Sequence, residues 1–115
     1  MDIDLYNELM KKSKQLDTAV KELRKSAYNY AKAYTDYRIE VAKQTLILRD
    51  KKTPVTVTSD LVRGMPSVAK LKFDEILSEG VYKANQESIQ AIKLQIRLLD
   101  AQMEREYSIA GKGDI

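Results

Sequence analysis

The sequence of 115 residues has no cysteine and no histidine, and it contains only four glycines and two prolines. Without cysteine, the chain cannot form a disulfide, a thiolate metal site or a cysteine nucleophile. Without histidine, it lacks the commonest general base and the commonest metal ligand. We therefore expect a protein that is not an enzyme and that uses neither a metal nor a cofactor. The shortage of glycine and proline also argues against a β-sandwich or barrel, which needs many turns.

Long apolar runs are also missing from the chain. No stretch approaches the ~20 consecutive apolar residues of a membrane-spanning helix. The acidic N-terminus, Met1-Asp2-Ile3-Asp4, lacks the apolar core of a signal peptide. We therefore expect no membrane partner and a location in the cytoplasm, and the absence of cysteine agrees with that compartment.

Charged residues make up 32% of the chain and hydrophobic residues 43%, which is typical of helix-rich or coiled-coil proteins. The formal net charge is +3, but its placement is uneven. Residues 49–72 contain six basic residues and only two acidic ones, Asp50 and Asp60, which gives this segment a net charge of +4. The six are Arg49, Lys51, Lys52, Arg63, Lys70 and Lys72.

A heptad pattern predicts a first long helix over about residues 4–50. From Tyr6 to Leu48 apolar residues recur at alternating intervals of three and four, interrupted by polar residues only at Ser13 and Gln44. Pro54 disfavours a helical conformation at Thr53, so the helix must end before it. The full stripe is Tyr6, Leu9, Leu16, Val20, Leu23, Ala27, Tyr30, Tyr34, Tyr37, Val41 and Leu48.

The connection, about residues 51–66, has a different pattern. The β-branched alternation from Thr53 to Thr58 predicts an extended segment. Ser59 or Asp60 can then cap a short helical turn, with Gly64 suited to a left-handed position after it. We expect the extended segment to pack across the end of the helices, although it could also add a strand to a partner's sheet.

A second long helix is predicted over about residues 67–108, with Ser67 as its N-cap. Its C-terminal half carries the stripe Ile89, Ile92, Ile96, Leu99 and Met103. Its N-terminal half carries a stripe that is out of phase with the first, namely Phe73, Leu77, Val81 and Ala84. This shift predicts a bend or a change of packing partner near Gly80. Gly111 and Gly113 predict a disordered tail over residues 111–115.

These elements predict an all-α fold in which two long helices form an antiparallel, coiled-coil-like hairpin, with an extended connection and a short helical turn between them. The hairpin would form one domain over residues 1–110. Two helices alone bury little surface, and Leu94 and Leu98 lie beside the second stripe. We therefore expect a homo-oligomer, most simply a dimer.

Two groups of residues have both a functional and a structural interpretation. The tyrosine cluster could stack nucleic-acid bases, but Tyr30, Tyr34 and Tyr37 lie on the stripe and only Tyr28 lies off it, which favours packing. The carboxylate pairs Glu75 with Glu79 and Asp100 with Glu104 could share a metal. Nearby Lys and Arg residues favour ordinary surface ion pairs instead.

The basic connection is the predicted partner-binding site, consisting of Arg49, Lys51, Lys52, Arg63, Lys70 and Lys72. Such a cluster can contact phosphates or an acidic protein. It can equally be a solvated turn whose charges complement the dipole of the first helix. No helix-turn-helix, zinc-finger or RNA-recognition motif accompanies it.

Several short segments together resemble a known group of proteins. They are Tyr37-Arg38, Pro54-Val55-Thr56, Asp60-Leu61-Val62-Arg63-Gly64, Val68-Ala69, Leu71-Lys72, Tyr82-Lys83-Ala84 and Arg105-Glu106-Tyr107. In this order they resemble small uncharacterised helical proteins of Gram-positive bacterial phages and prophages, often encoded among early or recombination genes. The resemblance covers most of residues 30–107 and implies a phage accessory protein in the cytoplasm of the bacterial host cell. It supplies no site residues.

Together, the shape and the resemblance lead to a ranked set of expectations. The first is a non-catalytic phage-type accessory protein that binds and modulates or inhibits a host nucleic-acid-processing or defence complex, so that the partner is a host or phage protein. The second is a DNA-binding accessory protein of phage recombination or replication, with nucleic acid as the partner. The third is a structural oligomerisation module.

Overall fold

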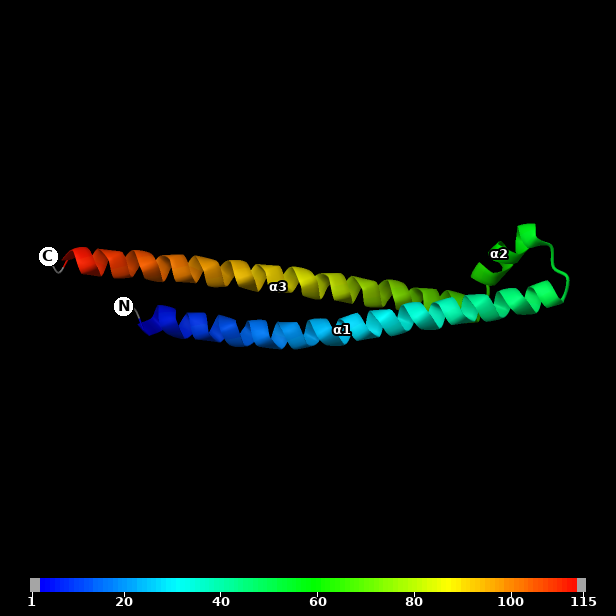
Figure 1. Ribbon diagram of the computed structural model, residues 1–115, viewed down its shortest axis with the longest axis horizontal. Helices are drawn as coiled ribbons and strands as arrows, with labels where there is room; N and C mark the ends of the chain where they lie inside the picture. The colour runs from blue at the N-terminus through cyan, green and yellow to red at the C-terminus, as the bar shows by residue number, and fades with distance from the viewer. Residues whose placement is uncertain (1–2, 114–115) are drawn as a thin grey trace. The chain divides into compact units, whose positions relative to one another are not determined.

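The computed structural model describes residues 3–113, and the side chains of residues 3–109. Over the described residues there are three helices, α1 (Ile3–Asp50), α2 (Val55–Arg63) and α3 (Pro66–Gly113). Figure 1 shows α1 and α3 as the long helices and α2 between them in the chain. The predicted all-α fold with two long helices is therefore confirmed.

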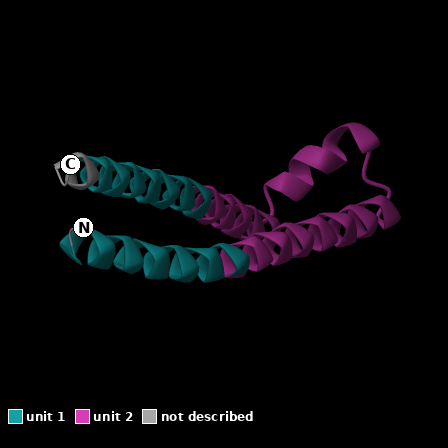
Figure 2. Cartoon of the chain, turned by 60° about the vertical axis from the view of Figure 1, so that its left-hand side comes forward, with its two compact units in different colours: residues 1–24, 84–115 teal, residues 25–83 magenta. Residues whose placement is uncertain are grey.

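The chain divides into two compact units, coloured separately in Figure 2. Unit 1 contains residues 1–24 and 84–115, and unit 2 contains residues 25–83. In each unit a segment of α1 lies antiparallel to a segment of α3, and unit 2 also contains α2. The single domain expected over residues 1–110 stays a prediction.

The residues through which α1 and α3 face each other within a unit form a row that we call the seam. In unit 1 the seam follows the predicted stripes, and Ile89 is buried in it. Leu9, Leu16, Val20 and Leu23 of α1 and Ile92, Ile96, Leu99 and Met103 of α3 are half-buried. Tyr6, predicted as the first stripe residue, is mostly exposed at its edge.

The seam of unit 2 departs from the predicted stripe on α3. Glu75 is buried, and Leu71, Ser78 and Tyr82 are half-buried, so these residues face α1. The apolar residues that the sequence pattern assigned to this position are instead exposed, namely Phe73, Leu77, Val81 and Ala84. This stripe does not pack on α1, and within the described residues it is open to solvent, so the predicted change of packing partner stays a prediction. The helix itself continues without interruption across Gly80.

The C-terminus of α1 is closed by a left-handed residue that is not glycine. This residue is Lys52, whose φ is 63°. The amide of Thr53 donates to the carbonyl of Leu48 at 3.0 Å, and the amide of Lys52 donates to the carbonyl of Arg49 at 3.0 Å. This is the hydrogen-bond pattern of a Schellman motif, in which glycine usually occupies the left-handed position. The chain therefore turns away from α1 immediately before Pro54, as the proline predicts.

The connection is more helical than the sequence indicated. The prediction of an extended segment was wrong for residues 55–58, because α2 begins at Val55 directly after Pro54, which has an extended ψ of 141°. The hydroxyl of Thr58 donates to the Pro54 carbonyl at 2.8 Å, so this β-branched residue supports the first turn instead of a strand. Thr58 and Val62 are buried on the inner face of α2.

The junction between α2 and α3 corrects two further predictions. Gly64 ends α2 with φ −83°, so it does not occupy a left-handed position. The helix α3 starts at Pro66, the position where a proline costs no hydrogen bond, so Ser67 lies inside the helix and is not its N-cap. The Ser67 hydroxyl instead donates to a carboxylate oxygen of Glu40 on α1 at 3.1 Å.

At the other end, α3 continues through Gly113, beyond the predicted end near residue 108. The predicted disordered tail over residues 111–115 was therefore wrong for residues 111–113. Residues 114–115 lie outside the described residues. Within residues 3–113, no helix is both long enough and apolar enough to cross a membrane.

Candidate functional site

A cleft of about 460 Å³ lies between the C-terminal turns of α1 and the inner face of α2, within unit 2. We call it the α2 cleft. Helical spacing brings its α1 residues onto one face, since they recur at intervals of three and four. From α1 these are Tyr37, Arg38, Val41, Thr45 and Arg49, and from α2 they are Val55, Thr58, Ser59, Val62 and Arg63.

The lining combines a cationic rim with hydroxyl groups and an apolar floor. Arg38 and Arg49 come from α1 and Arg63 from α2, and no acidic residue lines the cleft. Buried Val62 forms part of the floor. A guanidinium group presents several N–H donors in one plane, which suits a carboxylate or phosphate group bound in two-point fashion.

Arg49 is held by the turn that follows α1. One of its guanidinium nitrogens, Nη1, donates to the carbonyl of Thr53 at 2.9 Å. This bond uses one of five donors and leaves the others available. Among the described side chains, neither Arg38 nor Arg49 nor Arg63 forms an ion pair.

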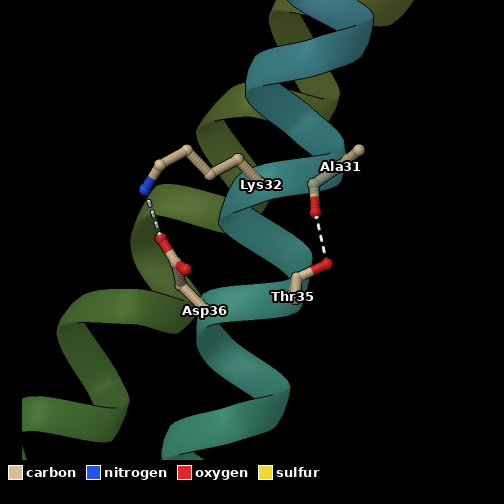
Figure 3. A network of polar contacts seen from close by, with 4 residues as sticks. All are labelled: Ala31, Lys32, Thr35 and Asp36. Carbon is tan, nitrogen blue, oxygen red and sulfur yellow. Dashed lines mark hydrogen bonds and ion pairs between the residues drawn. The ribbon is translucent and has the colours of Figure 1, made fainter.

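Three lysines of unit 2, namely Lys32, Lys72 and Lys83, are paired with carboxylates. Figure 3 shows the surface of α1 before the cleft, where Lys32 Nζ lies 2.8 Å from Asp36 Oδ2 and the Thr35 hydroxyl donates to the Ala31 carbonyl. The hydrogen bond with Asp36 raises the pKa of Lys32 above its ordinary value. Asp36 thus offsets the charge of Lys32, whereas no carboxylate in the described part of the chain forms an ion pair with the three arginines of the cleft.

A second cavity, of about 370 Å³, is lined by Tyr37, Arg63, Val68 and Lys72, so it shares two residues with the α2 cleft. Lys72 Nζ lies 4.9 Å from the centre of the Tyr37 ring and 3.0 Å from Glu75 Oε2. The hydrogen bond with Glu75 raises the pKa of Lys72, so this lysine stays charged. Its charge is offset by buried Glu75 and is less available to a ligand.

The six residues predicted as a partner site therefore divide into two sets. Arg49 and Arg63 line the α2 cleft, and Lys72 lines the adjoining cavity. Lys51, Lys52 and Lys70 are exposed and line neither.

Sequence reasoning missed Arg38, because it lies outside the basic segment of residues 49–72. Its spacing could have revealed it. Residues eleven apart share one face of an α-helix, and Arg38 precedes Arg49 by that interval.

Tyr30, Tyr37 and the carboxylates Glu75 and Glu79 take the structural roles predicted for them, whereas Tyr34, predicted to pack on the stripe, is exposed. Tyr30 and Tyr82 face each other across the seam with ring centres 6.0 Å apart, whereas Tyr28 is exposed. Glu75 pairs with Lys72, and Glu79 pairs with Lys83 at 2.7 Å. In the part of the chain that the structure describes, no group of three or more acidic residues could hold a metal ion.

Comparison with protein-family models, curated proteins and solved structures gave no match for this chain. The functional argument therefore rests on the geometry of the site and on the sequence.

Proposed function

We propose that this chain is a non-catalytic accessory protein of the phage type, acting in the bacterial cytoplasm, which binds a host nucleic-acid-processing or defence complex and modulates or inhibits it. The α2 cleft is the proposed contact surface. The observation that carries the proposal is the set of three arginines from two helices, around an apolar floor and without a carboxylate among them.

The cleft suits an acidic protein segment with apolar residues between its carboxylates. Carboxylates would bind the guanidinium groups of the rim, and small apolar side chains would cover the valines of the floor. Regular duplex DNA fits less well, because its phosphates lie on a convex backbone and bind extended tracks of positive charge. Lys51, Lys52 and Lys70, which could extend such a track, do not line the cleft.

A DNA-binding accessory role is the second candidate, supported by the net charge of +4 over residues 49–72. Of the six basic residues there, Lys72 is paired with Glu75. The other five are exposed and can contact phosphates, namely Arg49, Lys51, Lys52, Arg63 and Lys70. A third proposal, that the protein works as a homo-oligomer, is supported by the exposed apolar residues of α3.

A triple variant separates the first two candidates. The cleft variant combines three changes, Arg38→Gln, Arg49→Gln and Arg63→Gln, and removes the three positive charges of the cleft. The matched control combines Lys11→Gln, Lys14→Gln and Lys21→Gln, and removes the same charge from exposed residues of unit 1. The probes are a labelled peptide of alternating Glu and Leu residues and a labelled DNA duplex, with binding followed by fluorescence anisotropy at physiological salt. Circular dichroism verifies that both variants keep their helices.

We expect the wild-type chain and the control to bind the peptide, and the cleft variant to lose roughly tenfold in affinity for each arginine removed. Peptide binding that is absent, or that survives the cleft changes, would overturn the proposal. Tight duplex binding that only the cleft variant loses would establish the DNA candidate in its place.

A further inference from the structure

The side of α3 turned away from α1 in unit 2 carries a second surface. It consists of Phe73, Ile76, Leu77, Gly80 and Val81, and we call it the outer face of α3. These residues recur at intervals of three and four and so share one side of the helix. Phe73 is 64% exposed, Ile76 58%, Leu77 57% and Val81 48%.

Neither α1 nor α2 covers this face. The residues of the same segment that face α1 are Leu71, Glu75, Ser78 and Tyr82, which are buried or half-buried. The inner face of α2, with Thr58 and Val62, is directed at the α2 cleft. The most apolar side of this segment of α3 is therefore the side that the described chain leaves open.

The size of the face suits a weak interface between two copies. At exposed fractions of 48–64%, the four side chains present on the order of 400 Å² of apolar surface. Two copies would then bury at most about 800 Å² of it, just below the ~1,000 Å² at which specific interfaces begin, so the dimer should be a weak one.

The spacing of the face is also self-complementary. Phe73 and Val81 lie four residues before and four residues after Leu77. A two-fold axis at Leu77 would place each Leu77 beside its copy, each Phe73 on a Val81, and each Ile76 beside the bare surface of a Gly80. A side chain added at Gly80 would meet nothing within 4 Å, so the helix surface there is open. Such reciprocal contacts are the mark of an isologous dimer.

We propose that the protein forms a homodimer in which the outer faces of two α3 helices pack antiparallel about Leu77. This inference rests on the oligomeric part of the proposed function and is independent of the α2 cleft. It differs from the surface that the sequence pattern suggested, which lies on α3 in unit 1; there Ile92, Ile96, Leu99 and Met103 are partly covered within the seam, whereas Leu94 and Leu98 are exposed.

The first test is mass in solution, measured by light scattering at roughly 50–100 μM, where a weak dimer would be populated. The wild-type chain should show about twice its 13.2 kDa mass, and Leu77→Glu should return it to a monomer. The control is Leu98→Glu, a change at an equally open leucine of unit 1, 61% exposed, which should leave the dimer unchanged. Both changes introduce a good helix former at an exposed site, and circular dichroism verifies the helices.

The second test locates the two-fold axis. The chain has no cysteine, so Leu77→Cys introduces a single thiol that a short bismaleimide should join to its copy, while Leu98→Cys should remain largely unjoined. A wild-type monomer, or a dimer that survives Leu77→Glu, would overturn the proposal, as would equal cross-linking at both sites. Peptide binding by Leu77→Glu is scored separately, so failure of the dimer and failure of the cleft are distinguishable.

Discussion

Unit 1 and unit 2 join the same two helices through different kinds of residue. In unit 1 the α3 side of the seam is formed by Ile89, Ile92 and Ile96, whereas in unit 2 the corresponding row contains Glu75, Ser78 and Tyr82. On α3 of unit 2, Val68 is buried and Leu71 is half-buried, but Phe73, Ile76, Leu77 and Val81 are exposed on the outside of the helix. Unit 1 thus pairs α1 with α3 through apolar residues, although Leu94 and Leu98 stay exposed there, whereas unit 2 pairs the helices through a largely polar row.

The largest effect should come from the apolar seam. Ile89 is 5% exposed, so Ile89→Ala should cost about 2–4 kcal/mol of unfolding free energy, as buried isoleucine truncations do. Leu94→Ala, at an exposed position of the same helix, should stay within ~0.5 kcal/mol. Urea denaturation measures both. If both variants lost the same unfolding free energy, burial in the seam of unit 1 would not determine how much a residue contributes to stability.

This prediction corrects the ranking that the heptad pattern alone would give. The pattern treats Leu23 and Ile96 as core residues, but both are half-buried. Each should therefore lose less stability on truncation to alanine than Ile89 does.

A smaller effect, of opposite sign, is expected where the seam is polar. Glu75→Leu in unit 2 replaces a buried carboxylate with a side chain of the type that unit 1 uses. Lys72 is 47% exposed and stays solvated without its partner, so the change mainly removes the desolvation penalty of the carboxylate, a gain of roughly 1 kcal/mol. Hydrogen exchange of the backbone amides of residues 25–83 measures the gain, and Glu104→Leu, at an exposed position of unit 1, is the control. If amide exchange slowed in both variants, the gain in stability would not be specific to the polar seam of unit 2.

The smallest effect concerns acid. The hydrogen bond from Lys83 holds the pKa of Glu79 below its ordinary value of 4.5, and Tyr30 also donates to this carboxylate. A carboxylate whose pKa is lower in the folded chain stabilises the fold above its unfolded pKa and loses that contribution as the pH falls through the folded pKa. The protection factors of the unit 2 amides, which correct for the intrinsic pH dependence of exchange, should therefore fall as the pH falls below about 4.5.

The variant Glu79→Gln isolates this contribution, because it cannot titrate. Its acid sensitivity should be weaker than that of the wild-type chain. The hydrogen bond from Gln44 likewise lowers the pKa of Glu40, so part of the acid response should remain in the variant. A pH profile unchanged by the substitution would mean that Glu79 does not contribute.

The long helices could be predicted from the sequence because local spacing determines them. The heptad stripe identified α1, and Pro54 placed its end correctly. The row of α3 that faces α1 in unit 2 could not be predicted in the same way. Apolar spacing pointed to Phe73 and Leu77, but the actual seam contains Glu75, which is tolerable there only because Lys72 pairs with it. That pair is local, three residues apart on one helix, but which row of α3 faces α1 depends on the fold and cannot be predicted from the hydrophobic pattern.

The candidate site was predicted in part for a similar reason. A charge count along the sequence identified Arg49 and Arg63, yet it also selected Lys51, Lys52 and Lys70, which do not line the cleft. Arg38 was missed because it is distant in sequence from the others, and only the packing of α2 against α1 brings the three arginines around one cavity. The β-branched residues around Thr58 misled the prediction of the connection, since a proline and a side-chain hydrogen bond favour a helix there.

The division of the chain between the units has a consequence for chain entropy. Unit 2 is one continuous stretch, residues 25–83, whereas unit 1 joins residues 1–24 to residues 84–115 across that stretch. The entropic cost of closing a loop rises with its length, by about 0.6 kcal/mol for each doubling. Pairing near the connection closes short loops and can proceed through a seam of serine, tyrosine and glutamate. When α1 and α3 pair at the chain ends, they close the longest loops. The seam that offsets this entropic cost contains the isoleucines and leucines of unit 1.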